Sequence, residues 1–112
     1  MNELKAVLEG AVNNGTVNGF HNDLEQYTVS EMVNVPIRIL EVAIINTRYG
    51  EMVKMLVEGK ETKARAVVRS TSQIILRQVK ALADKGLIPT QGFVVAKAVK
   101  TKQGTTYKLE AV

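Results

Sequence analysis

Residues 63–86 read KARAVVRSTSQIILRQVKALADKG, and within this stretch the hydrophobic period changes from that of a strand to that of a helix. In the first part, small or β-branched residues alternate with basic residues, which is typical of a strand with one buried face. The alternation assigns Ala64, Ala66 and Val68 to the inward face and Lys63, Arg65 and Arg69 to the outward face. This basic outward face makes the strand our first candidate for contact with an anionic ligand.

The second part of the stretch predicts one amphipathic helix. Ser70 and Gln73 have the spacing of a capping box, in which each side chain bonds to an unpaired backbone N–H group at the helix start. An apolar stripe then continues along one face, at Ile75, Val79 and Leu82. Gly86 suits the left-handed residue that follows a helix, so we expect the helix to span residues 71–86.

Two strand-like runs precede this stretch and are joined by a turn. The first begins directly after Pro36, and its inward phase shifts near Leu40 and Glu41, as if one extra residue were inserted. That shift predicts a β-bulge, which lets a long strand bend around a small barrel. Residues 46–50 supply the turn, with Gly50 free to adopt a positive φ angle. The second run has an inward face made of Val53, Met55 and Val57.

A last pair of strand-like runs follows the helix, over residues 91–100 and 105–110, with a turn between them. The predicted order is therefore β-β-β-α-β-β, which is the order of a five-stranded OB-fold barrel. We expect an all-β fold with one helix, in which residues 35–112 form the OB-fold domain. Residues 1–34 would be an N-terminal arm, made of a short helix and a loop, and a candidate contact between subunits.

The charges are divided unevenly along the chain. Residues 1–47 contain two Lys or Arg and six Asp or Glu, whereas residues 48–112 contain thirteen Lys or Arg and five Asp or Glu. A basic body of this kind suggests a polyanionic partner, although a well-solvated surface would give the same pattern. The sequence has no cysteine and no apolar stretch of membrane-spanning length, so we expect a protein of the cytoplasm with no membrane partner.

Enzymatic chemistry has little support in the sequence. The single histidine, His21, lies near Asp23 in a polar segment without a nucleophile or a set of metal ligands. The glycines do not have the spacing of a P-loop or of a dinucleotide-binding fingerprint. We therefore expect no catalytic residue, no metal, no cofactor and no small-molecule substrate.

Two segments resemble the single-stranded DNA-binding proteins of bacteriophages and bacteria that use one OB-fold, especially small ones from phages of Gram-positive hosts. One covers residues 37–57, with Arg48, Tyr49 and Gly50 at its turn, and the other covers residues 87–107, which end in KTKQGTTY. The resemblance implies a protein that coats single-stranded DNA in phage-type replication or recombination, in the host cytoplasm if phage-encoded. It also implies a homo-oligomer, a dimer or a tetramer, because contacts along one strand add avidity.

Binding of single strands needs cations along the phosphates and flat side chains on which bases stack. The candidate nucleic-acid-binding residues are Arg48, Tyr49, Lys54, Lys63, Arg65, Arg69, Lys97, Lys100 and Lys102. Tyr49 is the first candidate for stacking, whereas Phe93 and Tyr107 could serve either stacking or the core. The basic residues of the helix are expected to lie away from the ligand face, at Arg77, Lys80 and Lys85.

The alternative hypothesis is an OB-type module that binds RNA or an acidic protein partner through the same basic surface. Strand coating predicts a steep loss of affinity with salt and little base preference, which separates the two hypotheses. The sequence leaves the choice between DNA and RNA open.

Overall fold

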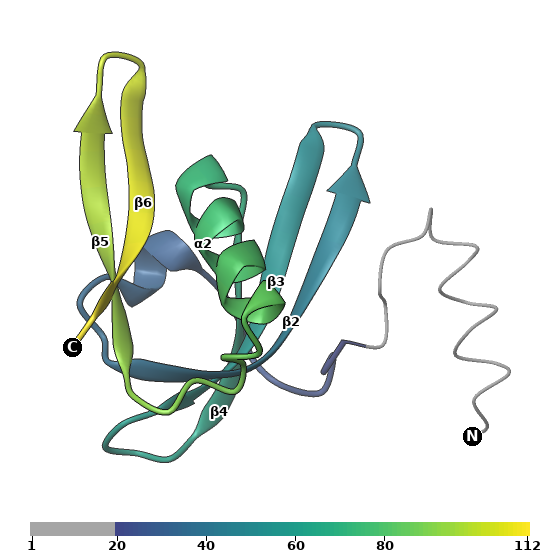
Figure 1. The fold of residues 1–112 in the computed structure, drawn as a ribbon, viewed down its shortest axis with the longest axis vertical. Helices are drawn as coiled ribbons and strands as arrows, with labels where there is room; N and C mark the ends of the chain where they lie inside the picture. The colour runs from purple at the N-terminus through teal and green to yellow at the C-terminus, as the bar shows by residue number, and fades with distance from the viewer. Residues whose placement is uncertain (1–19) are drawn as a thin grey trace, which may run out of the picture.

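The computed structural model describes residues 20–112, in which six strands form one sheet that curls into a half-barrel with a single α-helix against it (Figure 1). The strands are β1 (Gln26–Thr28), β2 (Ile37–Thr47), β3 (Gly50–Gly59), β4 (Arg65–Ser70), β5 (Val94–Thr101) and β6 (Gly104–Ala111). A 3-10 helix, η1 (Val29–Met32), follows β1, and α2 (Gln73–Asp84) lies between β4 and β5 in the chain. The fold is mostly β with one helix, and its order of elements is compatible with an OB-like fold.

The strands lie in the order β1-β4-β3-β2-β5-β6. The predicted order of three strands, a helix and two strands is confirmed, and β1 adds a sixth strand that the sequence did not reveal. β1 pairs in parallel with β4, with Gln26 opposite Val67. A strand of three residues is too short to show a period of two. The division at residue 35 stays a prediction, and the short helix expected in the arm lies outside the described residues.

A β-bulge bends β2. The register of β2 against β3 shifts between Ile39 and Glu41, which confirms the predicted insertion near Leu40. Ile39, before the bulge, is fully buried, and beyond it Ile44 is 37% exposed while Ile45 is buried. Figure 1 shows the β2–β3 hairpin projecting past the helix. Gly50 has a φ of +114°, as the turn prediction required.

The start of α2 differs from the prediction by two residues. Its N-cap is Ser72, whose Oγ atom accepts a hydrogen bond from the Ile75 N–H group at 3.3 Å. The predicted capping box at Ser70 is wrong, because Ser70 is the last residue of β4 and its Oγ atom accepts from the Ser72 N–H group at 3.0 Å. The predicted stop is confirmed: Gly86 has a φ of +68°.

The core is formed by the inner face of the sheet, α2 and η1. Its buried members include Val29, Ile37, Ile39, Val53, Met55, Val57, Val68, Ile75 and Val79. The predicted inward faces of β3 and of the helix are thereby confirmed, except that Leu82 is only half-buried. On the opposite face of the sheet, Val67 lies between Arg65 and Arg69 and is fully buried. Leu56, which is opposite Val67 on β3, is also buried. The outward face of β4 is thus not uniformly basic.

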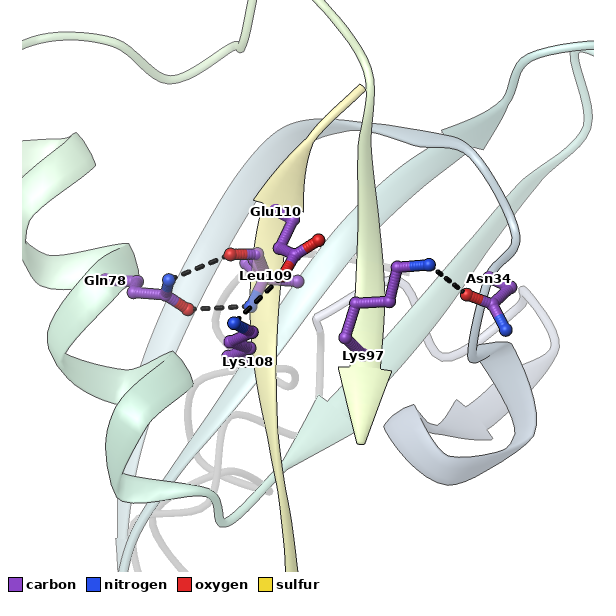
Figure 2. A network of polar contacts seen from close by, with 6 residues as sticks. All are labelled: Asn34, Gln78, Lys97, Lys108, Leu109 and Glu110. Carbon is purple, nitrogen blue, oxygen red and sulfur yellow. Dashed lines mark hydrogen bonds and ion pairs between the residues drawn. The ribbon is translucent and has the colours of Figure 1, made fainter. Parts of the chain in front are cut away.

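Within residues 20–112 no strand pair joins β4 to β6, and α2 spans this gap instead. The Gln78 Nε2 atom donates to the Leu109 carbonyl at 2.9 Å, and its Oε1 atom accepts from the Leu109 N–H group at 2.8 Å (Figure 2). The Ser72 hydroxyl donates to the Tyr107 carbonyl at 2.6 Å. Because side chains of the helix replace a neighbouring strand, a groove can lie between β6 and the end of β4.

Candidate nucleic-acid interface

A groove of about 640 Å³ lies between the β4–α2 junction and the β5–β6 hairpin, with the β1–η1 junction forming another part of its wall. We call it the basic groove. Two of its lining side chains are arginines, Arg69 at the end of β4 and Arg77 in the second turn of α2. Among the described residues that line it there is no Asp or Glu, and most of the others carry hydroxyl or amide groups. This lining suits an anion.

Both arginines are available to a ligand. Arg69 and Arg77 are exposed, and neither forms an ion pair with any residue of the described part of the chain. The Arg77 Nε atom donates to the backbone carbonyl of Gln73 at 3.3 Å, which leaves the terminal nitrogens of its guanidinium free of protein partners within residues 20–112. A guanidinium binds phosphate through paired N–H donors, so two of them in one groove favour a phosphate-bearing ligand.

Some hydroxyl groups of the groove form hydrogen bonds that connect its walls. The Ser72 hydroxyl joins α2 to β6, and the Thr106 Oγ1 atom lies 3.2 Å from the Ser72 Oγ atom. Tyr107 packs against the core and also lines the groove. Phe93 does not line the groove: it is half-buried, with the Lys60 ammonium 5.7 Å from its ring centroid.

Two hairpin tips project on the side of the molecule where α2 lies (Figure 1). Their turns are alike, since Thr47 precedes Gly50 as Thr101 precedes Gly104, and each threonine hydroxyl donates to the glycine carbonyl, at 2.7 and 2.8 Å. The turn positions hold Arg48 and Tyr49 at one tip and Lys102 and Gln103 at the other. Tyr49 is 90% exposed. Each tip thus presents one cation to solvent, and Gln103 and Thr101 also line the basic groove.

Several other predicted site residues lie near the groove. Lys54 is opposite Arg69 in the β3–β4 register, so these two side chains share the outer face of the sheet. Lys100 is opposite Thr105, which lines the basic groove. The structure therefore brings Arg69, Lys100 and Lys102 to the groove or its border and places Lys54 beside Arg69.

Three predicted residues lie elsewhere or are engaged in contacts. Lys63 is not on β4 with Arg65 and Arg69: it precedes the strand, in a turn where its φ is +59°. The Arg65 Nε atom is 3.6 Å from a Glu58 carboxylate oxygen, on the outer face of the sheet. The Lys97 ammonium donates to the Asn34 Oδ1 atom at 2.6 Å (Figure 2). These contacts reduce what each residue offers to an anion.

Arg77 lies in the groove although the basic residues of the helix were expected on the side away from the ligand. The first turns of α2 form one wall of the basic groove. Lys80 and Lys85 do not line it, and Lys80 is paired with Glu51 at 3.0 Å. A signal was present, because Arg77 lies four residues after Gln73 and so shares the face on which the chain enters the helix from β4.

Comparison with protein-family models, with curated protein sequences and with solved structures finds no match to this chain. Within residues 20–112 there is no group of three or more acidic or histidine side chains placed to hold a metal ion. The same part of the chain has no helix with the length and hydropathy needed to cross a bilayer.

Proposed function

We propose that this chain is a sequence-tolerant single-stranded DNA-binding protein that coats strands in DNA replication or recombination of the phage type. The observation that carries the proposal is the basic groove, which combines two exposed arginines with no acidic lining residue. A basic groove with aromatic surfaces is the common requirement of single-strand binding, and Tyr107 is the aromatic residue of this groove. The cations of the hairpin tips extend the positive surface beyond it. The expected dimer or tetramer remains part of the proposal.

The experiment is a titration of labelled oligo-dT, oligo-U and duplex DNA, followed by fluorescence anisotropy over a series of salt concentrations. We expect oligo-dT to bind more tightly than the duplex, with an affinity that falls steeply with salt because phosphate contacts release counterions. Tighter binding of oligo-U would favour the alternative of an RNA-binding module. Absence of binding to all three ligands at low salt would contradict a nucleic-acid function and leave an acidic protein partner as the remaining hypothesis.

A matched pair of double variants tests whether the basic groove is the site. Arg69→Gln with Arg77→Gln should weaken oligo-dT binding by about tenfold or more and reduce the salt slope by about 1.4, since each single-strand phosphate contact contributes about 0.7. Lys80→Gln with Lys85→Gln removes the same charge from α2 and its C-cap, outside the groove, and should change both quantities much less. Equal losses from the two double variants would show that binding depends only on net charge.

A further inference from the structure

A second groove, of about 520 Å³, lies at the other end of the β2–β3 hairpin. It is lined by the residues before β2, the start of β2, the end of β3 and the start of β4. Its interior is mainly apolar and includes Leu24, Met32, Val35 and Val57. Val35 is 39% exposed, so the apolar interior is open to solvent. We call this the acidic-rimmed groove, for the reason that follows.

Asp23 and Glu25 lie on the rim of this groove, and neither forms an ion pair within residues 20–112. The Glu25 carboxylate accepts a hydrogen bond from the neutral Tyr27 hydroxyl, which leaves its charge uncompensated. Arg65 also lines the groove, but it is paired with Glu58. In the described part of the chain, four other carboxylates are paired with a cation or with His21, namely Glu41, Glu51, Glu58 and Glu110. Asp23 and Glu25 therefore place two carboxylates without an ion pair at one groove.

The tip of the β2–β3 hairpin has the complementary features. Tyr49 is an aromatic side chain that is 90% exposed, and Arg48 beside it forms no ion pair with the described residues. The hydrogen bond from the Tyr49 N–H group to the Thr47 Oγ1 atom, at 3.1 Å, holds the turn in place. An exposed aromatic ring next to a cation is suited to an apolar groove with an acidic rim.

Tip and groove cannot meet within one molecule. The register of the hairpin runs from Ile37 opposite Gly59, which line the groove, to Thr47 opposite Gly50 at the tip. Strands rise about 3.3 Å per residue, so the two ends are separated by roughly 30 Å. The tip of one copy can reach only the groove of another.

We propose that this protein associates head to tail, with Tyr49 of one copy inserted into the acidic-rimmed groove of the next and Arg48 facing Asp23 and Glu25. The two surfaces differ, so the contact is heterologous and extends into an open chain of molecules unless the rotation closes it into a ring. The tip and the acidic-rimmed groove lie at opposite ends of the β2–β3 hairpin, so successive copies would be arranged along the direction of this hairpin. The contact involves no nucleic acid and goes beyond the function proposed above.

Sedimentation velocity without nucleic acid tests this contact over a range of protein concentrations at low and high salt. We expect the wild-type protein to form species larger than a monomer at low salt and to dissociate at high salt. Tyr49→Ser and Arg48→Glu should each raise the dissociation constant about tenfold or more. Leu87→Ser removes another exposed apolar side chain, two residues after Lys85, and should leave association unchanged, because Leu87 follows α2 in the chain and is not at the tip.

Mixing two variants that each associate poorly gives the decisive result. Tyr49→Ser retains an intact groove, and Asp23→Lys with Glu25→Lys retains an intact tip. Their equimolar mixture should form a one-to-one dimer that grows no further, because it holds one intact tip and one intact groove. Thermal unfolding of each variant checks that it is folded. If Tyr49→Ser is not folded, Arg48→Gln replaces it in the mixture, because glutamine creates no charge that would complement the introduced lysines.

A wild-type protein that stays monomeric at low salt, or a mixture that stays monomeric, would overturn the proposal. So would a loss from Leu87→Ser as large as that from Tyr49→Ser, because association would then be nonspecific. Binding of an oligo-dT short enough for one protein is measured on Tyr49→Ser. A loss there would assign Tyr49 to base stacking, whereas a loss of association alone separates this contact from the proposed DNA-binding function.

Discussion

Gly86 determines where the helix ends. Its φ of +68° lies in the left-handed region, and the Leu87 N–H group that follows bonds back to the Leu82 carbonyl at 2.9 Å. This reverse turn satisfies a carbonyl that the end of the helix would otherwise leave unpaired. The chain then continues toward β5, which begins at Val94.

Gly86→Ala should destabilise the protein by about 1 to 2 kcal/mol, the usual penalty for a Cβ atom in the left-handed region. An added Cβ atom would meet nothing within 4 Å at Gly86 or at Gly92, so steric contact is not the cause at either position. Gly92 does not have a positive φ, and Gly92→Ala is therefore the matched control. Urea unfolding of both variants measures the difference, and equal stabilities would contradict a backbone origin.

Among the contacts between elements, those of Gln78 replace the hydrogen bonds that a neighbouring strand would make to β6. Its amide bonds to both the N–H and the carbonyl group of Leu109, which lie on the edge of β6 that has no strand neighbour in the described structure (Figure 2). An unpaired edge invites pairing with another chain, and a covering helix is one way to prevent it. The same two bonds hold α2 against β6 and thereby keep the width of the basic groove.

Gln78→Ala should lower the free energy of unfolding by about 1 to 3 kcal/mol, because it leaves two partly buried backbone groups of Leu109 without partners. Gln73→Ala is the control on the same helix, since the Gln73 side chain is exposed and forms no hydrogen bond within residues 20–112. Chemical denaturation measures both. If the two substitutions cost the same, the Gln78 bonds do not contribute net stability.

At the scale of the described molecule, residues 20–112, the hairpin tips and the basic groove carry cations without an ion pair, and the acidic-rimmed groove carries two carboxylates without one. Two carboxylates at other positions are stabilised in their charged form. The pKa of Glu31 is lowered because the Thr28 N–H group and hydroxyl donate to its carboxylate, with a smaller effect from the charge of Arg69. The pKa of Glu110 is lowered by the hydrogen bond and the charge of Lys108.

Both pKa shifts stabilise the folded protein at pH values above 4.5, the usual pKa of the carboxyl group. This stabilisation should be lost as the pH falls through the lowered pKa values that Glu31 and Glu110 have in the folded protein. Glu31→Gln with Glu110→Gln should therefore lower the melting temperature at neutral pH, and the difference from wild type should shrink below about pH 4.5. Glu61→Gln with Asp84→Asn is the control, since neither side chain is bonded within the described residues. A difference that persists at low pH would contradict the assignment.

The sequence by itself determined the local features of this protein. The bulge near Leu40, the turn at Gly50 and the helix stop at Gly86 could all be predicted, because each depends on the backbone preferences of a few adjacent residues. The order of elements followed from hydrophobic periods in the same way. The start of the helix was misplaced because Ser70 and Ser72 are both able to cap, and only the pairing of Ser70 in β4 decides between them.

Only the tertiary structure decided the features that join distant parts of the chain. The parallel pairing of β1 with β4 and the bonds from Gln78 to Leu109 have no local signal, and the spacing of Arg77 from Gln73 does not by itself show that Arg69 lies in the same groove. Each depends on the curvature of the sheet and on where the helix crosses its open side. Periodicity assigns a residue to a face of its own element, but the neighbours of that face are set by the packing of all elements together.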